Sequence, residues 1–243
     1  MAQSAVRFDQ VRKNYGKQAV LQGIDLDISA GMSFGLVGIN GAGKTTLIKC
    51  LLDFCHLDSG RIEIFGIRHT DNPARARLAF LPERFMPPYF LTGRDFLNYM
   101  LALDQRAAGE DRVRAMFGDL DLDTAALDKP VRSYSKGMTQ KLGLAACLLA
   151  EPDLLILDEP MSGLDPLARA RVKQLLRQLR ERGRTLFFTS HALSDVEEIC
   201  EQMLVLHQGR SCYCGSPGAL RQSYSCDSME QAFLKCIESG AHD

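Results

Sequence analysis

The sequence predicts an α/β fold, in which a largely parallel sheet carries an inserted helical segment. Two observations predict it. Short apolar strands alternate with helical patterns in the first and last thirds of the 243-residue chain, as expected for parallel strands joined by helices. Between about residues 84 and 150 the strand patterns disappear and helical spacing takes their place.

Charge and hydropathy exclude some classes of protein. Lys and Arg total 29 and Asp and Glu total 30, so the formal net charge is -1. A nucleic-acid-binding domain usually has a basic excess, so we expect no nucleic-acid partner. No apolar run approaches the ~18 residues needed to span a bilayer, and residues 1–7 lack the features of a signal peptide. We therefore expect a cytosolic protein that reaches any membrane through a partner.

The eight cysteines are scattered along the chain. Several, such as Cys147, fall inside apolar patterns, where a free cysteine is usually a small core residue in a reducing compartment. A metal site at Cys212 and Cys214, with His207 nearby, is the alternative. A single residue separates these cysteines, whereas structural zinc sites usually have two to four, so the spacing favours the first interpretation.

Apolar patterns identify the strands. Ile24, Leu26 and Ile28 alternate with polar residues, as in a half-buried strand, and Ile62 and Ile64 repeat the pattern. We expect short strands over the first thirty residues. Mostly apolar runs predict further strands at residues 33–37, 154–157, 185–189 and 203–206.

Capping residues indicate where helices begin. Thr92 followed by Asp95 resembles a capping box. Asp165 precedes a proline that suits the first helical position. Ser135 precedes apolar residues at helical spacing. Two further helix starts are predicted, at Ser194 with Glu197 and at Ser228 with Gln231.

A glycine-rich loop joins the strand at residues 33–37 to a helical segment at residues 47–52. It contains the pattern G-x-x-x-x-G-K-[ST], in which backbone amides surround phosphate groups at a helix N-terminus. We expect Lys44 to reach the outer phosphates and the Thr45 hydroxyl to bind Mg²⁺. A chance glycine-rich turn is disfavoured by the flanking strand and helix. The residues expected to contact the nucleotide here are Gly38, Asn40, Gly41, Ala42, Gly43, Lys44, Thr45 and Thr46.

Two carboxylates, Asp158 and Glu159, end the apolar strand at residues 154–157. Ligands of open α/β sheets bind at the carboxyl ends of the strands, so both acids are expected near the phosphate loop. Asp158 is suited to hold a metal ion through water. Glu159 is suited to orient and deprotonate an attacking water molecule. The second carboxylate favours steady ATP turnover over a nucleotide switch.

Residues 134–140, Tyr-Ser-Lys-Gly-Met-Thr-Gln, lie just before the acidic strand. They resemble the signature motif of ABC ATPases, usually Leu-Ser-Gly-Gly-Gln. Ser135 would cap a helix whose free amides form a second anion site. Taken alone, this segment is also compatible with an ordinary capped helix.

Other motifs of the ABC ATPases occur in the family's order. Tyr15 lies where the family has an aromatic residue that stacks on adenine, and Glu83 lies in the Q-loop position. Residues 162–165 resemble the D-loop, and His191 resembles the switch histidine that contacts the γ-phosphate. Singly, His191 is compatible with a structural role and Tyr15 with simple packing. The order of the motifs, from about residue 5 to residue 220, favours the functional roles.

The resemblance implies a P-loop NTPase fold. It consists of a RecA-like, mostly parallel sheet core, an antiparallel β subdomain and an inserted α-helical subdomain. Residues 1–243 would form a single ABC ATPase domain. Its α/β catalytic core would take residues 1–83 and 151–220, its helical subdomain residues 84–150, and a C-terminal helix residues 221–243.

The resemblance also implies the cofactors ATP and Mg²⁺ and an ATPase that powers a transporter. Glu159, His191, Lys44 and Glu83 are the expected catalytic residues. Thr45, Asp158 and Glu83 are the expected metal ligands.

In the family, each signature motif faces the phosphate loop of another subunit. Ser135, Gly137 and Asp165 are therefore expected to contact the nucleotide of a second copy in a head-to-tail dimer. The other expected partner is an integral membrane permease subunit. The expected location is peripheral, on the cytoplasmic face of the inner (plasma) membrane.

Some residues depart from the family's common pattern. Glu83 replaces the usual glutamine, and a glutamate there can still approach Mg²⁺ and the water. Tyr134, Lys136 and Met138 give the signature a form similar to type-2 exporter subunits, which serve drugs, polysaccharides, gliding motility or copper processing. Met161 stands where threonine or serine is frequent, which we interpret as a packing difference.

The stretch from Leu81 to Met100, which contains Phe-Met-Pro-Pro-Tyr-Phe at residues 85–90, is unusually apolar for a loop. Exposed apolar patches are often interfaces. The resemblance implies a groove here that receives a coupling helix of the membrane subunit. Packing within the helical segment's own core is the alternative.

Two other functions are compatible with the motifs. A non-transport ABC ATPase of repair, chromosome architecture or translation usually has a coiled coil, zinc modules or tandem ATPase domains, and the sequence has none of these patterns. A non-catalytic ATP-binding regulator is disfavoured because the expected catalytic residues are present.

Overall fold

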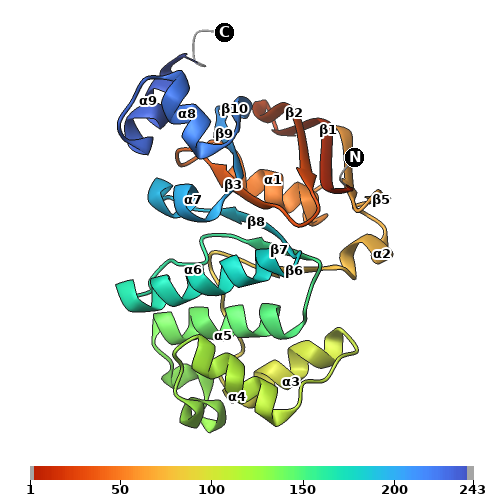
Figure 1. The fold of residues 1–243 in the computed structure, drawn as a ribbon. Helices are drawn as coiled ribbons and strands as arrows, with labels where there is room; N and C mark the ends of the chain where they lie inside the picture. The colour runs from red at the N-terminus through yellow and green to blue at the C-terminus, as the bar shows by residue number, and fades with distance from the viewer. Residues whose placement is uncertain (1–2, 240–243) are drawn as a thin grey trace.

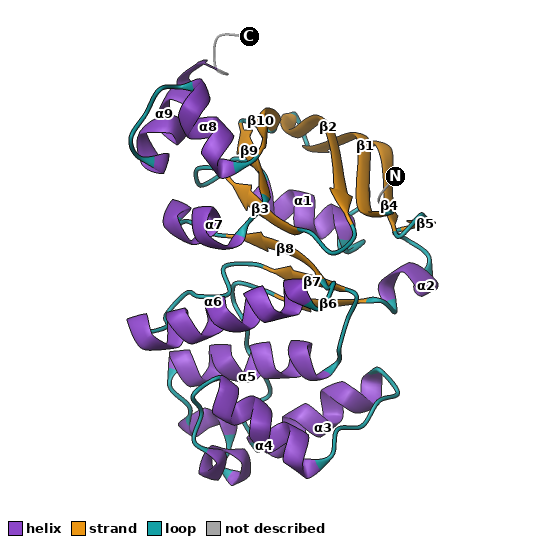
Figure 2. Ribbon diagram, viewed as in Figure 1, coloured by secondary structure: helices purple, strands orange, loops and turns teal. Residues whose placement is uncertain are grey.

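The computed structural model describes residues 3–239, which form two sheets covered by helices (Figures 1 and 2). The larger sheet has six strands in the order β10-β9-β3-β8-β7-β6. Strands β3, β8, β7, β6 and β9 pair in parallel, and β10 pairs antiparallel with β9. The predicted α/β class with a mostly parallel sheet is confirmed. Its strands are β3 (Ser33–Val37), β6 (Leu78–Leu81), β7 (Leu154–Leu157), β8 (Thr185–Thr189), β9 (Gln202–His207) and β10 (Arg210–Gly215).

The smaller sheet is antiparallel, with strands in the order β2-β1-β4-β5. Its strands are β1 (Ser4–Tyr15), β2 (Gln18–Ser29), β4 (Ser59–Ile64) and β5 (Ile67–Arg68). The expectation of short strands in the first thirty residues was wrong, because β1 and β2 form one long hairpin. The pairing of β1 shifts between Phe8 and Val11, and Gln10 has a φ of 47°. This irregularity breaks the alternation and makes one strand look like two.

The larger sheet separates two hydrophobic cores. On one face, Leu154 and Ile156 of β7 join a core that includes Ile48 of α1 (Lys44–Leu51) and the smaller sheet. On the other face, Leu155 and Leu157 join a core shared with the helical segment. Successive residues of a strand point to opposite faces, so one fully apolar strand serves both cores.

The helical segment lies beyond this second face (Figure 1). Between residues 84 and 150 it contains α3 (Gly93–Leu103), α4 (Glu110–Asp119), two short 3₁₀ turns (Thr124–Asp128 and Val131–Ser133) and α5 (Lys136–Leu149). The predicted capping box at Thr92 is present, with the Asp95 N–H donating to Thr92 Oγ1 over 3.1 Å. Helix α5 is buried from Gln140 to Leu149. The expected helical insertion is confirmed.

The remaining helices are α2 (Asn72–Arg75), α6 (Pro166–Glu181), α7 (Leu193–Ile199), α8 (Pro217–Ser223) and α9 (Met229–Ser239). Asp165 caps α6 as predicted, and Ser228 accepts a hydrogen bond from the Gln231 N–H. The predicted cap at Ser194 was wrong, because α7 begins at Leu193. Ser190 supplies the hydroxyl instead, accepting from the Ala192 N–H over 3.1 Å.

The expectation of a single C-terminal helix over residues 221–243 was also wrong. That range begins inside α8 and continues through α9, and residues 240–243 lie outside the described part of the chain. Ser216 caps α8 and Pro217 occupies its first turn, the same signal that marks α6. Within residues 3–239, no helix has the length and apolar character needed to cross a membrane.

Candidate functional site

A solvent-open pocket of about 240 Å³ lies where β3, β6, β7 and β8 end at one edge of the sheet. Parallel neighbouring strands deliver the residues that follow them to the same place, which explains why distant motifs meet here. The volume is below the ~300 Å³ typical of the smallest ligand pockets. The pocket is lined by Tyr15, Val20, Asn40, Gly41, Ala42, Gly43, Lys44, Thr45, Thr46, Glu83, Asp158, Glu159 and His191.

The glycine-rich loop forms one wall of this pocket. Gly43 caps α1 with a φ of 111°, a conformation that favours glycine. Gly38 lies behind the wall, and a Cβ there would come 2.3 Å from the Leu206 carbonyl oxygen. Lys44 Nζ donates to the carbonyl oxygens of Gly38 (2.6 Å) and Ile39 (3.3 Å). Burial lowers the pKa of Lys44, although the neighbouring carboxylates act in the opposite direction.

Thr189, the last residue of β8, holds the two carboxylate residues of the opposite wall. Its hydroxyl donates to Asp158 Oδ1 over 2.7 Å and accepts from the Glu159 N–H over 3.0 Å. All three residues are buried. Burial raises the pKa of Asp158, and the hydrogen bond from Thr189 partly offsets this.

Glu159 is fixed at its backbone and at its carboxylate. It has a φ of 51°, which is uncommon for a residue with a side chain. Its Oε2 accepts from the His191 N–H over 3.2 Å, and its Oε1 lies 3.4 Å from His191 Nε2. Oε1 is buried and accepts no hydrogen bond from the described residues. Burial raises the pKa of Glu159, and His191 acts against that rise. The arrangement leaves one basic oxygen free for a proton.

Gln140 connects α5 to the same turn. Its Nε2 donates to the carbonyl oxygens of Glu159 (3.4 Å) and Pro160 (3.2 Å). The roles of Gln140 and Thr189 were not predicted from the sequence, because they depend on contacts that only the folded chain brings together. A polar residue opening the otherwise apolar face of α5 was the available signal for Gln140. Val20, which lines the pocket with Tyr15, was also missed.

The oxygen donors at this pocket fit a magnesium ion. Asp158 and Glu83 both line it, and the charge of Glu83 contributes to raising the pKa of Asp158. The Thr45 hydroxyl lines the same pocket. The described residues hold no cluster of three or more His, Cys, Asp or Glu side chains able to bind a metal. Mg²⁺ typically uses one or two carboxylates, water and substrate phosphates, so this smaller donor set suits it.

Among residues 3–239, Cys212, Cys214 and His207 belong to no such metal-binding cluster. His207 Nδ1 is buried without a hydrogen-bond partner there.

Ser135, Gly137 and Asp165 do not line the pocket. Ser135 caps α5, accepting from the Met138 N–H over 3.2 Å, and Asp165 caps α6. The two helix starts touch, because a Cβ on Gly137 would lie 3.3 Å from the Gly163 carbonyl oxygen. The stem of Lys136 covers Gly163. The unusual lysine therefore ties the signature-like segment to the loop before α6.

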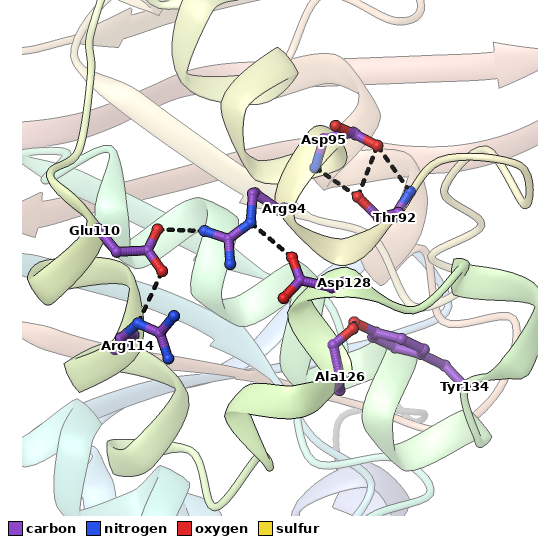
Figure 3. Close-up of polar contacts among 8 residues, drawn as sticks. All are labelled: Thr92, Arg94, Asp95, Glu110, Arg114, Ala126, Asp128 and Tyr134. Carbon is purple, nitrogen blue, oxygen red and sulfur yellow. Dashed lines mark hydrogen bonds and ion pairs between the residues drawn. The ribbon is translucent and has the colours of Figure 1, made fainter.

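Tyr134 anchors this segment to the rest of the helical region, as Figure 3 shows. Its hydroxyl donates to the Ala126 carbonyl oxygen over 2.7 Å. The same hydroxyl would lie 2.2 Å from a Cβ on Gly93, in the first turn of α3. Arg94 in that turn binds Asp128 (2.8 Å) and also pairs with Glu110 of α4. The start of α5 is thus joined to α3 and α4.

The apolar segment before α3 is divided between core and surface. Phe85 packs against Phe96 with ring centroids 5.6 Å apart. Met86, Tyr89 and Phe90 are 73%, 61% and 81% exposed. Core packing therefore describes Phe85 and the buried Pro87, whereas the three exposed side chains form an apolar surface.

Comparison with known proteins bears on the identity of the fold. Residues 21–162 match the family model described as ABC transporter. An uncharacterised ABC transporter ATP-binding protein of Synechocystis is 40% identical over 81% of this chain and 56% of its own length, so the chain spans little more than half of that relative. The Nod factor export ATP-binding protein I of Paraburkholderia xenovorans is 37% identical over 95% of this chain and 77% of its own length.

The solved structures agree. A structure described as the ATP binding subunit of an ABC transporter superimposes with a TM-score of 0.87 at 27% sequence identity. It matches 96% of this chain and 99% of its own. The expected fold, with a mostly parallel core, an antiparallel sheet and a helical insertion, is therefore the one that the chain adopts.

Proposed function

Because this chain belongs to the ABC transporter ATP-binding family, we propose that it binds and hydrolyses ATP to power export through a membrane-embedded partner. One observation carries the proposal: Lys44, Asp158, Glu159 and His191 line one pocket at the carboxyl edge of four neighbouring parallel strands. The Paraburkholderia relative is named for Nod factor export, which supports export over import.

In the proposed site, the phosphates lie in the glycine-rich loop and the adenine base stacks on Tyr15. The N-terminus of α1 and Lys44 supply positive charge to the phosphates. Tyr15 is 49% exposed at the end of β1, so its ring is accessible to a base. Mg²⁺, held by Thr45 and Asp158 with Glu83 nearby, would neutralise charge on the phosphate oxygens.

Glu159 is the proposed general base. A water molecule attacks the γ-phosphorus, Glu159 accepts its proton, and ADP leaves with its terminal oxygen freed. The raised pKa of Glu159 makes its carboxylate a stronger base. His191 steadies the γ-phosphate, and its N–H holds Glu159 Oε2 in place.

We also propose a head-to-tail dimer in which Ser135 and Gly137 contact the nucleotide of the second copy. Two observations support it. The pocket is open to solvent and small, and the signature-like helix start lies outside it. Residues Met86, Tyr89 and Phe90 are the proposed contact with an integral membrane permease, which would hold the chain peripherally at the cytoplasmic face of the inner membrane.

The Glu159→Gln variant tests the catalytic proposal. Because the amide cannot accept the proton, we expect ATP turnover to fall by about 10²- to 10⁴-fold, the usual value of general base catalysis. ATP binding should persist, because Lys44 and the loop are unchanged. Turnover is measured by phosphate release, and binding by equilibrium titration with a fluorescent ATP analogue.

Glu230→Gln, on the exposed first turn of α9, is the matched control and should keep wild-type turnover. Near-normal turnover in Glu159→Gln would remove Glu159 from its proposed role. Absence of ATP binding in the wild-type chain would overturn the proposed function itself.

A further inference from the structure

The C-terminal end of α1 brings two cysteines together beside the pocket. The helix ends in a Schellman motif: the Phe54 N–H donates to the Lys49 carbonyl (2.8 Å) and the Asp53 N–H to the Cys50 carbonyl (3.2 Å). Asp53 occupies the left-handed position with a φ of 60°. This reversal carries Cys55 back toward Cys50, and their Sγ atoms lie 3.5 Å apart.

The two thiols differ in their access to solvent. Cys50 is fully buried, and burial raises the pKa of its thiol to about 12. Cys55 is half-buried. A dissolved reagent therefore meets Cys55 first, and Cys50 reacts through its contact with Cys55.

Cys55 also lies next to Tyr15, a residue that lines the pocket. A hydrogen bond with Cys55 raises the pKa of the Tyr15 phenol. The Lys13 ammonium lies 5.3 Å from the centre of the Tyr15 ring and 3.5 Å from Asp58. Cys55 is thus a neighbour of Tyr15 as well as of Cys50.

We propose that Cys50 and Cys55 are a modification site, a dithiol that hydrogen peroxide converts to an intramolecular disulfide. The Cys55 thiol loses its proton, the thiolate attacks one peroxide oxygen, and the O–O bond breaks. The departing hydroxide takes up that proton, so that Cys55 sulfenic acid and water form. The Cys50 sulfur then attacks the Cys55 sulfur and loses its proton, and the hydroxyl leaves as water. One peroxide accepts two electrons, one from each sulfur, and two water molecules result.

Proximity supports the second step. A buried thiol is a weak nucleophile, but a partner held in contact reacts as if it were highly concentrated. The sulfur atoms must approach from 3.5 Å to about 2.05 Å, a movement within reach of side-chain rotation. The other described cysteines lack such a thiol contact.

The disulfide would remove the Cys55 thiol from its hydrogen bond with Tyr15. This consequence rests on the proposed function, since it assumes that Tyr15 contacts the nucleotide. We expect ATP affinity to fall by about three- to tenfold, as for the loss of one hydrogen bond. Formation of the disulfide itself does not depend on ATP binding.

The test treats the full chain with hydrogen peroxide, blocks remaining thiols by alkylation, and analyses tryptic peptides by mass spectrometry. Cleavage after Lys49 and Arg61 gives a peptide of residues 50–61 that contains these two cysteines and no others. We expect this peptide to lose two hydrogen atoms and escape alkylation, and to recover both thiols after reduction. Cys50→Ser should stop the reaction at a Cys55 sulfenic acid, which dimedone traps.

Cys214→Ser is the matched control, because Cys214 is exposed on β10, and it should form the disulfide normally. A 50–61 peptide with two alkylated thiols, under conditions that oxidise Cys214, would overturn the proposal. Unchanged ATP affinity in the fully oxidised chain would overturn the link to Tyr15 while leaving the modification site. Absence of ATP binding in the reduced chain would instead count against the proposed function.

Discussion

Thr189 organises both carboxylate residues although its side chain does not line the pocket. Its hydroxyl donates to Asp158 and accepts from the Glu159 N–H. Thr189→Val keeps the shape and removes both bonds. Because a buried N–H is left unpaired, we expect the free energy of unfolding to fall by about 1–3 kcal/mol. Misplacement of Glu159 should lower kcat by about 10- to 100-fold, with little change in KM for ATP, because the glycine-rich loop is untouched.

Thr189→Ser retains the hydroxyl and should stay within about threefold of wild-type kcat, so the pair separates hydrogen bonding from packing. The pH profile provides a second measurement. The Thr189 hydrogen bond lowers the pKa of Asp158. Loss of this hydrogen bond should raise the pKa of Asp158. As the pH is lowered, activity that requires the Asp158 carboxylate should therefore be lost at a higher pH in Thr189→Val than in wild type. If Thr189→Val and Thr189→Ser had equal kcat values and lost activity at the same acidic pH, the proposed role of the Thr189 hydroxyl would be contradicted.

At the scale of single residues, the sequence motifs identified several of the charged residues that line the pocket. Lys44, Asp158 and Glu159 stand in motifs whose spacing alone implies a phosphate site, and all three line the pocket. Thr189 and Gln140 were not predicted. Their side chains bond to atoms of residues that are distant in the sequence, Asp158 and Glu159 for Thr189 and Glu159 and Pro160 for Gln140, and only the folded chain establishes those neighbours.

Helices α6 and α7 are joined by ion pairs in which burial, more than charge, should determine stability. Asp195 is only 3% exposed and binds Arg169 (2.6 Å) and Lys173 (2.8 Å). Glu198, one turn later, also pairs with Lys173 and with Arg177, but is 40% exposed. The two acids thus share a helix and a partner and differ in their access to water.

We expect Asp195→Asn to lower the free energy of unfolding by about 1–3 kcal/mol, because a buried position loses the charge that pairs with Lys173 (15% exposed) and Arg169 (37% exposed). Glu198→Gln should cost at most about 1 kcal/mol, as for exposed pairs. Urea denaturation of both variants measures the difference. Similar losses in the two variants would show that the Asp195 pair behaves as an exposed one.

At the scale of elements, capping residues predicted the start of a helix correctly where the capping side chain belongs to the residue directly before that helix. Thr92, Ser135 and Asp165 all cap the helices that they were expected to cap. Ser194 failed because the hydroxyl that closes the turn before α7 belongs to Ser190. Helix α8 was missed although Ser216 and its following proline carry the signal used at α6. The bulge in β1 hid a long strand because side-chain alternation cannot show that the chain continues through an irregular pair.

At the scale of the whole molecule, backbone hydrogen bonds connect the exposed apolar surface of Met86, Tyr89 and Phe90 to the residues just before the signature-like segment. Met86, Tyr89 and Phe90 precede α3, and the backbone beside them bonds to the segment before Ser135. The Arg132 N–H donates to the Tyr89 carbonyl (3.2 Å) and the Val131 N–H to the Leu91 carbonyl (2.8 Å). A partner bound at this surface would therefore lie next to backbone that is hydrogen-bonded to the residues leading into α5.

If this surface binds the permease, a Tyr89→Ala/Phe90→Ala double variant should lose its membrane partner and keep its own activity. Both side chains are largely exposed, so stability should change little, and the ATPase rate of the isolated chain should remain near wild type. Affinity purification from gently solubilised membranes, followed by mass spectrometry, should recover a polytopic membrane protein with wild type at near equal amount, and far less with the variant.

Leu234→Ala is the control, since Leu234 is a similarly exposed apolar residue on α9, at the opposite end of the molecule from α3 (Figure 1). It should copurify with the membrane protein as wild type does. A double variant that still assembles and supports transport would show that this surface does not bind the permease. Recovery of only soluble proteins with wild type, where a control transporter stays intact, would place the chain among ABC ATPases that act away from membranes. That result would leave the proposed roles of Glu159 and Thr189 unaffected, because the hydrogen bond between them lies within one chain.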